Sequence, residues 1–434
     1  VITIPEPGLA EQLSEQQQAY LEILKSLLSE EETERLIIDT KSYYEWNSQE
    51  QDQTIIEQLQ ALKAADLPVE VKTYDIKETN LDDGIRMLSA AADVFETGYT
   101  SLMFDVSSVP VEKLHYLTLF THLLGSLDTE SFTKEDLNIL NIRYLNDASI
   151  QLSTIYNKNR NDFTPIILVS WSALMGEYEE QVTIINEILQ KTQFTDIDTI
   201  LSLVKQEISV LKYMFESSPV NLLASRGIAG FDACSSYQNY LYGLDYYSFL
   251  KEIEKILMVD PKRVLDELRA IHQLVLNRTN MITIFAGNEN SIEIYEYEMK
   301  EFIDGLPAKP IIKQDYSKLP VPAKKEGIVM DSTVQYNMVA ADYESVGTKF
   351  SGKFIPVALV ISENYTIPKI RFEHGAYDST VNFSPEFVVL ISYWDPKIRE
   401  TFDVYKGLPE FIREFDITQE ELDRYILKAF SSFT

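Results

Sequence analysis

A proline- and lysine-rich stretch constrains the fold of this chain more than any other sequence feature. Residues 307–325 read PAKPIIKQDYSKLPVPAKK. Proline lacks a backbone N–H and has a fixed φ angle, so such a stretch continues neither a helix nor a central strand. We interpret residues 307–325 as a connector. It divides the chain into a first domain at residues 67–306 and a second domain at residues 326–434, both preceded by residues 1–66.

Residues 1–66 have a helical sequence pattern. Leu9–Leu28 is polar-rich and helical, and Ser29 has the position of an N-cap for a second helix that opens with Glu30, Glu31 and Glu32. The dipole of a helix favours carboxylates in its first turn. Because the first helix has few aliphatic anchors, we predict a helical hairpin that links larger parts of a protein.

The first domain mixes strand and helix patterns. Runs rich in β-branched and aromatic residues predict strands at Glu70–Tyr74, Gly98–Val106, Ala148–Ile155, Thr164–Ser172 and Met281–Ala286. Apolar residues at helical spacing predict helices at Val111–Leu127, Thr133–Leu145, Tyr178–Leu189, Ile197–Met214, Tyr237–Met258, Pro261–Leu276 and Ser291–Ile303. We therefore predict an α+β domain with a long helical insert.

The second domain contains the most strand-like quarter of the chain. Lys353–Ser362 and Phe387–Trp394 are dense in β-branched and aromatic residues, so both predict strands. The remaining elements predicted are a strand at Gly327–Tyr336, a helical approach at Lys349–Phe354, and helices at Ile398–Phe415 and Thr418–Phe430. The order strand, helix, strand hairpin, helix occurs in both domains, which is typical of a duplicated unit.

The segment Ile370–Asp378 is the candidate site. If it were one flat strand, Arg371 and Tyr377 would share a face but lie about 20 Å apart, too far to act on one reacting centre. A bend at Gly375 would fold the tyrosine back toward the arginine, because glycine accepts unusual φ and ψ angles. The pair would then present a cation and a hydroxyl donor to developing negative charge.

The charge of the chain excludes some classes of partner. It has 38 basic and 68 acidic side chains, a formal net charge of −30. Such a field repels nucleic acid and anionic lipid and attracts cations, so we predict no nucleic-acid or membrane binding. No apolar run approaches the ~18 residues of a membrane helix. The acidic groups on predicted helices are interpreted first as solvated faces; they are Glu177, Glu179, Glu180, Glu289, Glu293, Glu296, Glu298 and Glu301.

The ends and the single cysteine bear on the origin of the chain. It opens on Val1 without a signal peptide, and we expect an internal fragment of a longer protein. Cys234 alone excludes an internal disulfide and a cysteine-based zinc site. Without an export signal we predict a cytoplasmic protein, with an organellar matrix as the alternative.

The four histidines do not form a recognisable metal site. His115 and His122 share a helix face, but seven residues separate them by about 10.5 Å along the helix axis. Zinc ligands lie about 2.0–2.1 Å from the ion, so this pair cannot hold one ion. His272 and His374 stand alone. We predict no complete zinc site in this chain.

Several motifs in order resemble a known family. They are Arg371-x-x-x-Gly375-Ala376-Tyr377, Trp394-Asp395-Pro396, residues 7–11 (PGLAE), Glu31–Trp46, and Asp403–Ile417 followed by TQEEL at residues 418–422. Together they are similar to the C-terminal half of presequence-protease-like zinc metallopeptidases, in the insulin-degrading, pitrilysin-type superfamily. The resemblance implies two related α/β-roll domains behind a helical hairpin linker, forming half of a clamshell peptidase.

The resemblance also implies a function. In such enzymes the N-terminal half, which this sequence does not contain, holds zinc in an H-x-x-E-H motif. The C-terminal half, which this chain resembles, encloses an oligopeptide substrate. Arg371 and Tyr377 would bind the substrate and stabilise the tetrahedral intermediate, with Gly375 and Ala376 as further substrate-binding positions. The acidic groups would attract basic peptides, and this chain alone would be inactive.

The chain departs from the family pattern at two positions, and other functions remain open. His374 stands where the family commonly has glycine, and Asp378 adds a negative charge beside Tyr377. One alternative is a non-catalytic peptide-binding or scaffolding subunit of a peptidase-like complex. Another is an unrelated acidic α+β binding protein.

Overall fold

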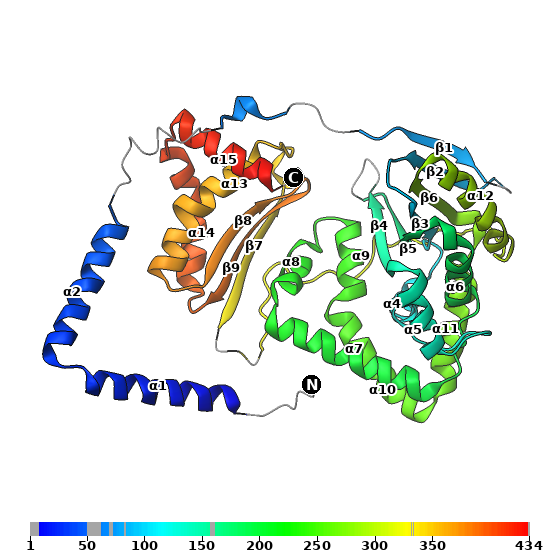
Figure 1. The fold of residues 1–434 in the computed structure, drawn as a ribbon, viewed down its shortest axis with the longest axis horizontal. Coiled ribbons are helices and arrows are strands. Elements are labelled where there is room, and N and C mark those ends of the chain that lie inside the picture. Colours follow the sequence, from blue (N-terminus) through cyan, green and yellow to red (C-terminus); the bar gives the residue numbers. More distant parts are fainter. Residues whose placement is uncertain are drawn as a thin grey trace. The chain divides into compact units, whose positions relative to one another are not determined.

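The computed structural model describes residues 8–49, 62–68, 73–81, 84–156, 161–330, 332 and 334–432. The chain divides into two units, Val1–Asp66 and Leu67–Thr434, whose elements are labelled in Figure 1. Each unit is described by itself below.

The described residues of the first unit form helices. They are α1 (Leu9–Leu27), α2 (Glu30–Asn47) and a short 3₁₀ turn at Ala64–Asp66. The predicted N-cap is confirmed: the Ser29 hydroxyl accepts from the Glu32 N–H, and the Glu32 carboxylate accepts from the Ser29 N–H at 2.9 Å. This reciprocal pair is a capping box, which stabilises the first turn. Side chains of residues 12–49 are all exposed, so these helices bury no core of their own.

A six-stranded mixed sheet organises the first part of the second unit. Its strands are β1 (Ile76–Asn80), β2 (Arg86–Ala91), β3 (Thr97–Asp105), β4 (Asn146–Tyr156), β5 (Phe163–Leu174) and β6 (Met281–Gly287). Their order is β1-β2-β6-β3-β5-β4, and only β2 and β6 run parallel. The long connection from β5 to β6 carries most of the helices of this part.

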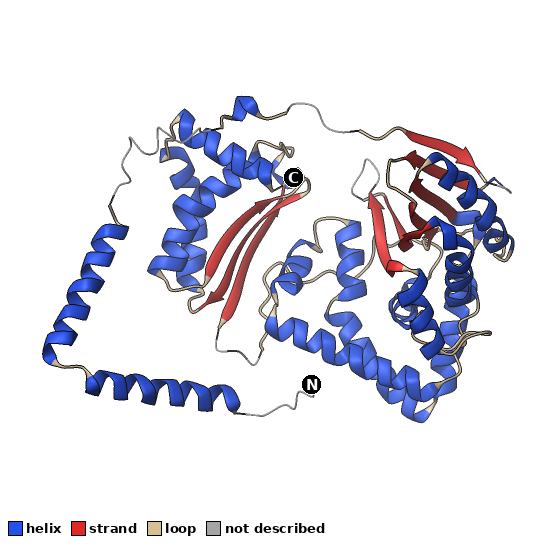
Figure 2. Cartoon of the chain, in the orientation of Figure 1, coloured by secondary structure: helices blue, strands red, loops and turns tan. Residues whose placement is uncertain are grey.

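Helices cover one face of this sheet (Figures 1 and 2). Alternate residues of β3 and β6 are buried, as expected when successive side chains point to opposite faces. On the covered face, the Thr100 hydroxyl lies 2.9 Å from the Tyr178 hydroxyl. The helices of this part are α4 (Leu114–Leu123), α5 (Lys134–Tyr144), α6 (Tyr178–Gln190), α7 (Ile197–Ser217), α8 (Val220–Ile228), α9 (Ala233–Tyr242), α10 (Leu244–Val259), α11 (Pro261–Val275) and α12 (Glu289–Asp304).

A second, three-stranded antiparallel sheet follows, in the order β7 (Gln335–Asp342), β9 (Phe387–Asp395), β8 (Asp378–Phe383). It packs with α13 (Phe354–Ile361), the π-helix η7 (Ser362–Glu373), α14 (Arg399–Glu414) and α15 (Gln419–Ser431) (Figure 1). These elements enclose a second hydrophobic core that includes Ile361, Ile370, Val381, Leu390 and Val404.

Contacts within the second unit join its two sheets through α8. The Arg226 guanidinium donates two 2.6 Å hydrogen bonds to the Glu326 carboxylate. Gly227 lies so close to β7 that a Cβ there would sit 1.8 Å from the Met338 Cε. The chain between the sheets contains Tyr316, which is buried in the first core and donates a 2.7 Å hydrogen bond to the Val109 carbonyl. The proline-rich segment is therefore bound to the first core at this point.

The fold confirms the predicted α+β class, and most helices lie where the sequence placed them. Predicted strands at Gly98–Val106, Ala148–Ile155, Thr164–Ser172 and Phe387–Trp394 are present as β3, β4, β5 and β9. The predicted strand Glu70–Tyr74 lies mostly outside the described residues. Among the described residues, no helix combines the length and apolar sequence that a membrane span requires.

Three predictions for the second domain are wrong. Lys353–Ser362 is mainly helix α13, Lys349–Phe354 is not helical before Phe354, and the described residues of Gly327–Tyr336 are irregular until β7 begins at Gln335. Arg371 lies in the π-helix η7. The apolar run of α13 packs on β8 and α15, with Ala358 and Ile361 buried. A short, continuously apolar segment suits a buried helix as well as a buried strand, and tertiary packing decides between them.

Candidate functional site

The candidate site lies where η7 ends and β8 begins. Arg371 is in the last turn of η7, and Tyr377 immediately precedes β8. Between them, the Ala376 N–H donates to the Ile370 carbonyl at 3.1 Å and the Gly375 N–H to the Arg371 carbonyl at 3.0 Å. With Gly375 at φ +84°, the bond from its N–H to the Arg371 carbonyl is that of an αL C-cap, in which a left-handed residue ends the helix. The predicted bend at Gly375 therefore exists as a helix terminus, since no strand precedes it.

The cap brings Arg371 and Tyr377 together. The guanidinium carbon of Arg371 lies 5.7 Å from the centroid of the Tyr377 ring, and also 5.7 Å from the Phe372 ring centroid. These distances are within the range of cation–π attraction. Within the described part of the chain Arg371 forms no ion pair. The Tyr377 side chain is 61% exposed, so the cation and the phenol are both available to a ligand.

Trp394, at the end of β9, completes this surface. Its ring centroid lies 5.0 Å from that of Tyr377, with the planes inclined by 48°. Trp394 is 52% exposed and Phe372 is 72% exposed. We refer to Arg371, Phe372, Tyr377 and Trp394 as the aromatic–arginine cluster. The sequence predicted two of its four members.

A buried carboxylate anchors the strand end that carries Trp394. Asp395 is fully buried and accepts hydrogen bonds from the Ser392 hydroxyl at 2.7 Å, the Thr401 hydroxyl at 2.6 Å and the Asn337 amide at 3.0 Å. Its other oxygen accepts from the Lys397 N–H at 2.8 Å. These donors come from β7, β9, the β9–α14 turn and α14. Asp395 therefore fixes the junction of these elements next to Trp394.

The other predicted site residues have structural positions. Ala376 is 5% exposed and its N–H belongs to the cap, as does that of Gly375. His374 lines a separate cavity between η7 and α14, together with Lys369 and Glu400. The Asp378 carboxylate accepts from the Ser379 N–H at 2.8 Å. His374 therefore faces α14, and the Asp378 carboxylate has a backbone partner.

The other three histidines have structural partners. His115 lies 2.9 Å from the Tyr240 carbonyl and stacks on the Tyr240 ring. His272 lies 2.6 Å from the Leu189 carbonyl, and burial lowers the pKa of both His115 and His272. His122 lies 3.3 Å from the Glu207 carboxylate. Across the described ranges, no three His, Cys, Asp or Glu side chains are grouped so that they could hold a metal ion.

Acidic side chains from two helices meet on the surface of the first core. Burial raises the pKa of Glu298 most, and the neighbouring carboxylates of Glu179 and Glu180 on α6 and of Glu301 on α12 raise it further. Glu179 and Glu180 of α6 therefore lie close to Glu298 and Glu301 of α12 and form one negative region with them. A region of this kind attracts cationic ligands.

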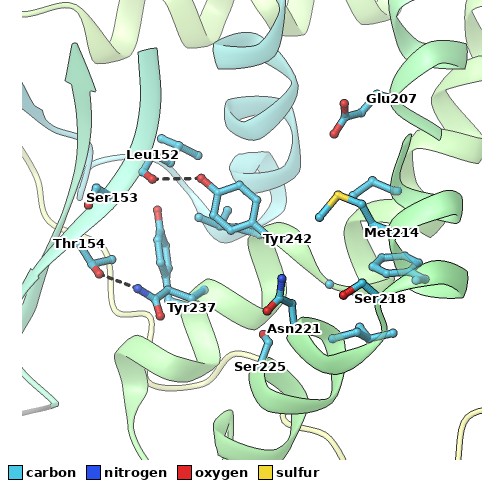
Figure 3. Close-up of a pocket in the computed structure, with 16 residues that line it drawn as sticks. Leu152, Ser153, Thr154, Glu207, Met214, Ser218, Asn221, Ser225, Tyr237 and Tyr242 are labelled. Carbon is cyan, nitrogen blue, oxygen red and sulfur yellow. Dashed lines mark hydrogen bonds between the residues drawn. The ribbon is translucent and has the colours of Figure 1, made fainter. Parts of the chain in front are cut away.

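A cavity of about 530 Å³ lies elsewhere in the second unit, between β4, α7, α8 and α9 (Figure 3). Its wall is mainly apolar, and two polar groups near it are already paired. Tyr242 donates to the Leu152 carbonyl at 3.1 Å, and Gln238 donates to the Thr154 hydroxyl at 2.9 Å (Figure 3). None of the aromatic–arginine cluster lines this cavity.

Comparison with known families decides the relationship. The family described as Peptidase M16 (subfamily C) associated matches residues 4–253, more than half of the chain. The chain belongs to this family. A second family, described as PreP C-terminal domain, matches residues 325–433, which include the whole aromatic–arginine cluster. The two matches cover the parts of the molecule on either side of the proline-rich segment, and the resemblance drawn from the motifs is confirmed.

Two curated relatives of this peptidase-associated chain align along almost its whole length. Protein HypA from Clostridium perfringens is 26% identical over 427 residues, covering 98% of this chain and 43% of that protein. Presequence protease 1, chloroplastic/mitochondrial, from Arabidopsis thaliana is 26% identical over 428 residues, covering 98% of this chain and 39% of that protein. The chain therefore spans about two fifths of the length of these relatives.

Solved structures share the fold. A peptidase M16 inactive domain from Pseudomonas fluorescens has a TM-score of 0.54 and 14% identity, covering 80% of this chain and 81% of that chain. A protease from Helicobacter pylori has a TM-score of 0.54 and 14% identity, covering 83% of this chain and 85% of that chain. The architecture of this chain is thus that of an M16 peptidase domain.

Proposed function

We propose that this chain is the substrate-enclosing C-terminal half of a presequence-protease-like oligopeptidase. The observation that carries the proposal is the convergence of Arg371 and Tyr377 on one exposed surface, within the region that matches the PreP C-terminal domain. The Arg371 guanidinium is solvent-accessible and forms no ion pair among the described residues, in a chain with a formal net charge of −30. Such a group is suited to receive negative charge from a ligand.

The two side chains would act on the peptide bond as donors. When a nucleophile attacks a peptide carbonyl, negative charge develops on the carbonyl oxygen. The guanidinium N–H groups of Arg371 and the hydroxyl of Tyr377 can donate hydrogen bonds to that oxygen. Donors held in place before the reaction stabilise the transition state without reorganising at the moment of attack. The cap at Gly375 and the anchor at Asp395 supply this fixed geometry.

The metal of such a peptidase does not fit the described residues of this chain. His115, His122 and His272 each bond to a neighbouring carbonyl or carboxylate, and His374 is half-buried against α14. We therefore place zinc, and the base that activates water, in an N-terminal half outside these residues. That half is the proposed partner, and oligopeptides carrying basic residues are the proposed substrates, because the acidic region on α6 and α12 attracts cations.

The test combines this chain with the N-terminal half of the same protein and measures cleavage of a basic peptide, with and without a chelator. Arg371→Ala is expected to lower kcat/KM by about 10²-fold or more, and Tyr377→Phe by a comparable factor, by analogy with other oxyanion donors. Arg86→Ala and Tyr297→Phe are matched controls, because both residues are exposed and lie outside the cluster. The controls are expected to cleave at the rate of the unmodified protein.

Two results would count against the proposal. A loss below about threefold for Arg371→Ala would remove this residue from the reacting site, since removing an oxyanion donor costs far more. Tight binding of the peptide by the combined halves without any cleavage would favour the non-catalytic peptide-binding subunit instead. Cleavage by this chain alone would contradict the prediction that it lacks part of the active site.

A further inference from the structure

Trp394 is an exposed member of the aromatic–arginine cluster to which the proposed function gives no role. It belongs to the Trp394-Asp395-Pro396 motif at the end of β9. An indole has a large apolar face, and burying it against other side chains is favourable. The fold nevertheless leaves 52% of this side chain exposed beside Tyr377.

The backbone at Trp394 adopts a conformation that bulky residues avoid. Its φ angle is +46°, in the left-handed region where the Cβ of an L-residue is crowded. Such a conformation persists only where the surrounding structure enforces it, and it is enriched at functional sites. Here the next residue, Asp395, is held by four hydrogen bonds. The anchor at Asp395 therefore fixes the direction in which the Trp394 ring points.

The surroundings of the Trp394 ring define the ligand group that it suits. The Tyr377 ring lies on one side of it, and the Phe372 ring extends the apolar surface beyond Arg371. The guanidinium of Arg371 has no partner carboxylate among the described residues, so its charge disfavours a cationic side chain at this place. Aromatic faces beside a cation favour a large uncharged apolar side chain.

We propose that Trp394 is a further substrate-contacting residue that binds a large apolar side chain of the peptide. This side chain is next to the peptide bond whose carbonyl oxygen accepts hydrogen bonds from Arg371 and Tyr377. This inference rests on the proposed function, which supplies the peptide. It adds Trp394 as the residue that selects the side chain next to the cleaved peptide bond. Peptides with a phenylalanine- or leucine-sized residue there are preferred over peptides with alanine.

Peptide binding to the 434-residue chain tests the assignment directly. Two labelled basic peptides differ only in having phenylalanine or alanine at one central position, and fluorescence anisotropy measures their Kd. Trp394 emission is read in a Trp46→Phe background, because Trp171 is buried and Trp46 is the other exposed tryptophan. The phenylalanine peptide is expected to change Trp394 emission. Trp394→Ala is expected to weaken binding of that peptide about 3–10-fold and of the alanine peptide by less than about twofold.

Trp394→Gly separates a binding role from a purely structural one. Glycine accepts the left-handed conformation, so this variant is expected to unfold at no lower urea concentration than Trp394→Ala while losing the same preference between peptides. Equal weakening of both peptides by Trp394→Ala, or saturation with the phenylalanine peptide without a change in Trp394 emission, overturns the assignment and leaves the proposed function standing. Failure of the unmodified chain to bind either peptide overturns the assignment of Trp394, while the proposed function is decided by the cleavage test on the combined halves.

Discussion

Replacing Asp395 by asparagine tests how the cluster is held in place. The substitution keeps the shape of the side chain and changes one acceptor oxygen into an NH₂ donor. One carboxylate oxygen accepts from Ser392, Thr401 and Asn337, and the other accepts from the Lys397 N–H. The two hydroxyls can rotate to accept instead of donate, but the Lys397 N–H cannot. The Asn337 amide can accept only by turning over, which gives up its donation to the Lys397 carbonyl. Either orientation of the new amide therefore opposes a fixed donor or costs an existing hydrogen bond.

The expected loss of stability follows from the number of buried donors that the substitution leaves without an acceptor. One buried donor left without an acceptor costs about 1–3 kcal/mol. The remaining bonds also weaken, because hydrogen bonds to charged groups contribute ~1.5–3 kcal/mol and neutral ones ~0.5–1.5 kcal/mol. We expect Asp395→Asn to reduce the local free energy of opening by about 2–4 kcal/mol. That corresponds to hydrogen exchange faster by a factor of about 30–1000 at the amides that this junction protects.

Hydrogen exchange read by mass spectrometry suits this measurement, because it reports local opening and does not require the whole chain to unfold in one step. The affected peptides should cover β7, β9 and the first turn of α14, while peptides from the six-stranded sheet keep their rates. Asp403→Asn is the matched control, since its carboxylate is exposed and pairs with Lys406 at the surface. An Asp395→Asn change below about 0.5 kcal/mol would refute the reasoning, because it would show that the four bonds carry no net stability.

Three further outcomes are expected. Gly375→Ala should lower the stability of the second core by about 1–2 kcal/mol in urea unfolding, because alanine is strained at φ +84°, whereas Gly327→Ala, in open space at ordinary φ, should change it little. Burial lowers the pKa of His272, so the unfolded chain takes up its proton first as pH falls below about 6.5 and stability is lost; His272→Gln should reduce this loss, and an unchanged pH dependence would contradict it. Raising the salt concentration should weaken binding of a basic peptide, as an isothermal titration series would show, since ions screen the field of a chain with net charge −30.

Most helices of this chain could be predicted because capping residues and the spacing of apolar residues are local sequence signals. Ser29 and Thr418 form capping boxes with the glutamates three residues later, and Thr133 accepts from the Asp136 N–H. Amphipathic spacing then placed α5, α6, α7, α11 and α12 closely, whereas α8 was not predicted and α9 and α10 were predicted as one helix, Tyr237–Met258. The strands β1 and β2 were not predicted, and β1 is exposed on every residue and has no alternation of apolar and polar side chains. Its position depends on pairing with β2.

The wrong prediction of a strand at Lys353–Ser362 has a physical cause. The run from Phe354 to Ile361 is apolar on all sides, so it has neither a helical nor a strand period, and its β-branched residues favoured the wrong choice. What makes it a helix is the space between β8 and α15, which no local pattern encodes. With α13 helical, the chain continues into η7, and Arg371 enters the site from a helix end.

The candidate site was partly predictable for a reason that does not depend on that error. A reversal at Gly375 brings Arg371 and Tyr377 together whether the preceding residues are strand or helix, because the left-handed glycine turns the chain in both cases. The reversal at Gly375 does not predict that Trp394 lies beside Tyr377. Trp394 is joined to Tyr377 by the β8–β9 pairing, in which Asp378 lies opposite Tyr393, and its exposure depends on the hydrogen bonds of the buried Asp395. The motif Trp394-Asp395-Pro396 was the only sequence signal.

The electrostatics of the proposed function act on two length scales, and they select different parts of a peptide. The net charge of −30 and the acidic region on α6 and α12 act over about a Debye length, roughly 8–10 Å in physiological salt, and raise the local concentration of basic peptides. Arg371 acts at contact distance, where its positive charge opposes a lysine or arginine beside the bond being cleaved. A peptide that satisfies both has basic residues away from the bond and an apolar residue against Trp394. Moving a single lysine along an otherwise fixed peptide should therefore lower kcat/KM most when it reaches the position next to the bond, and a flat dependence on lysine position would show that Arg371 does not face the substrate there.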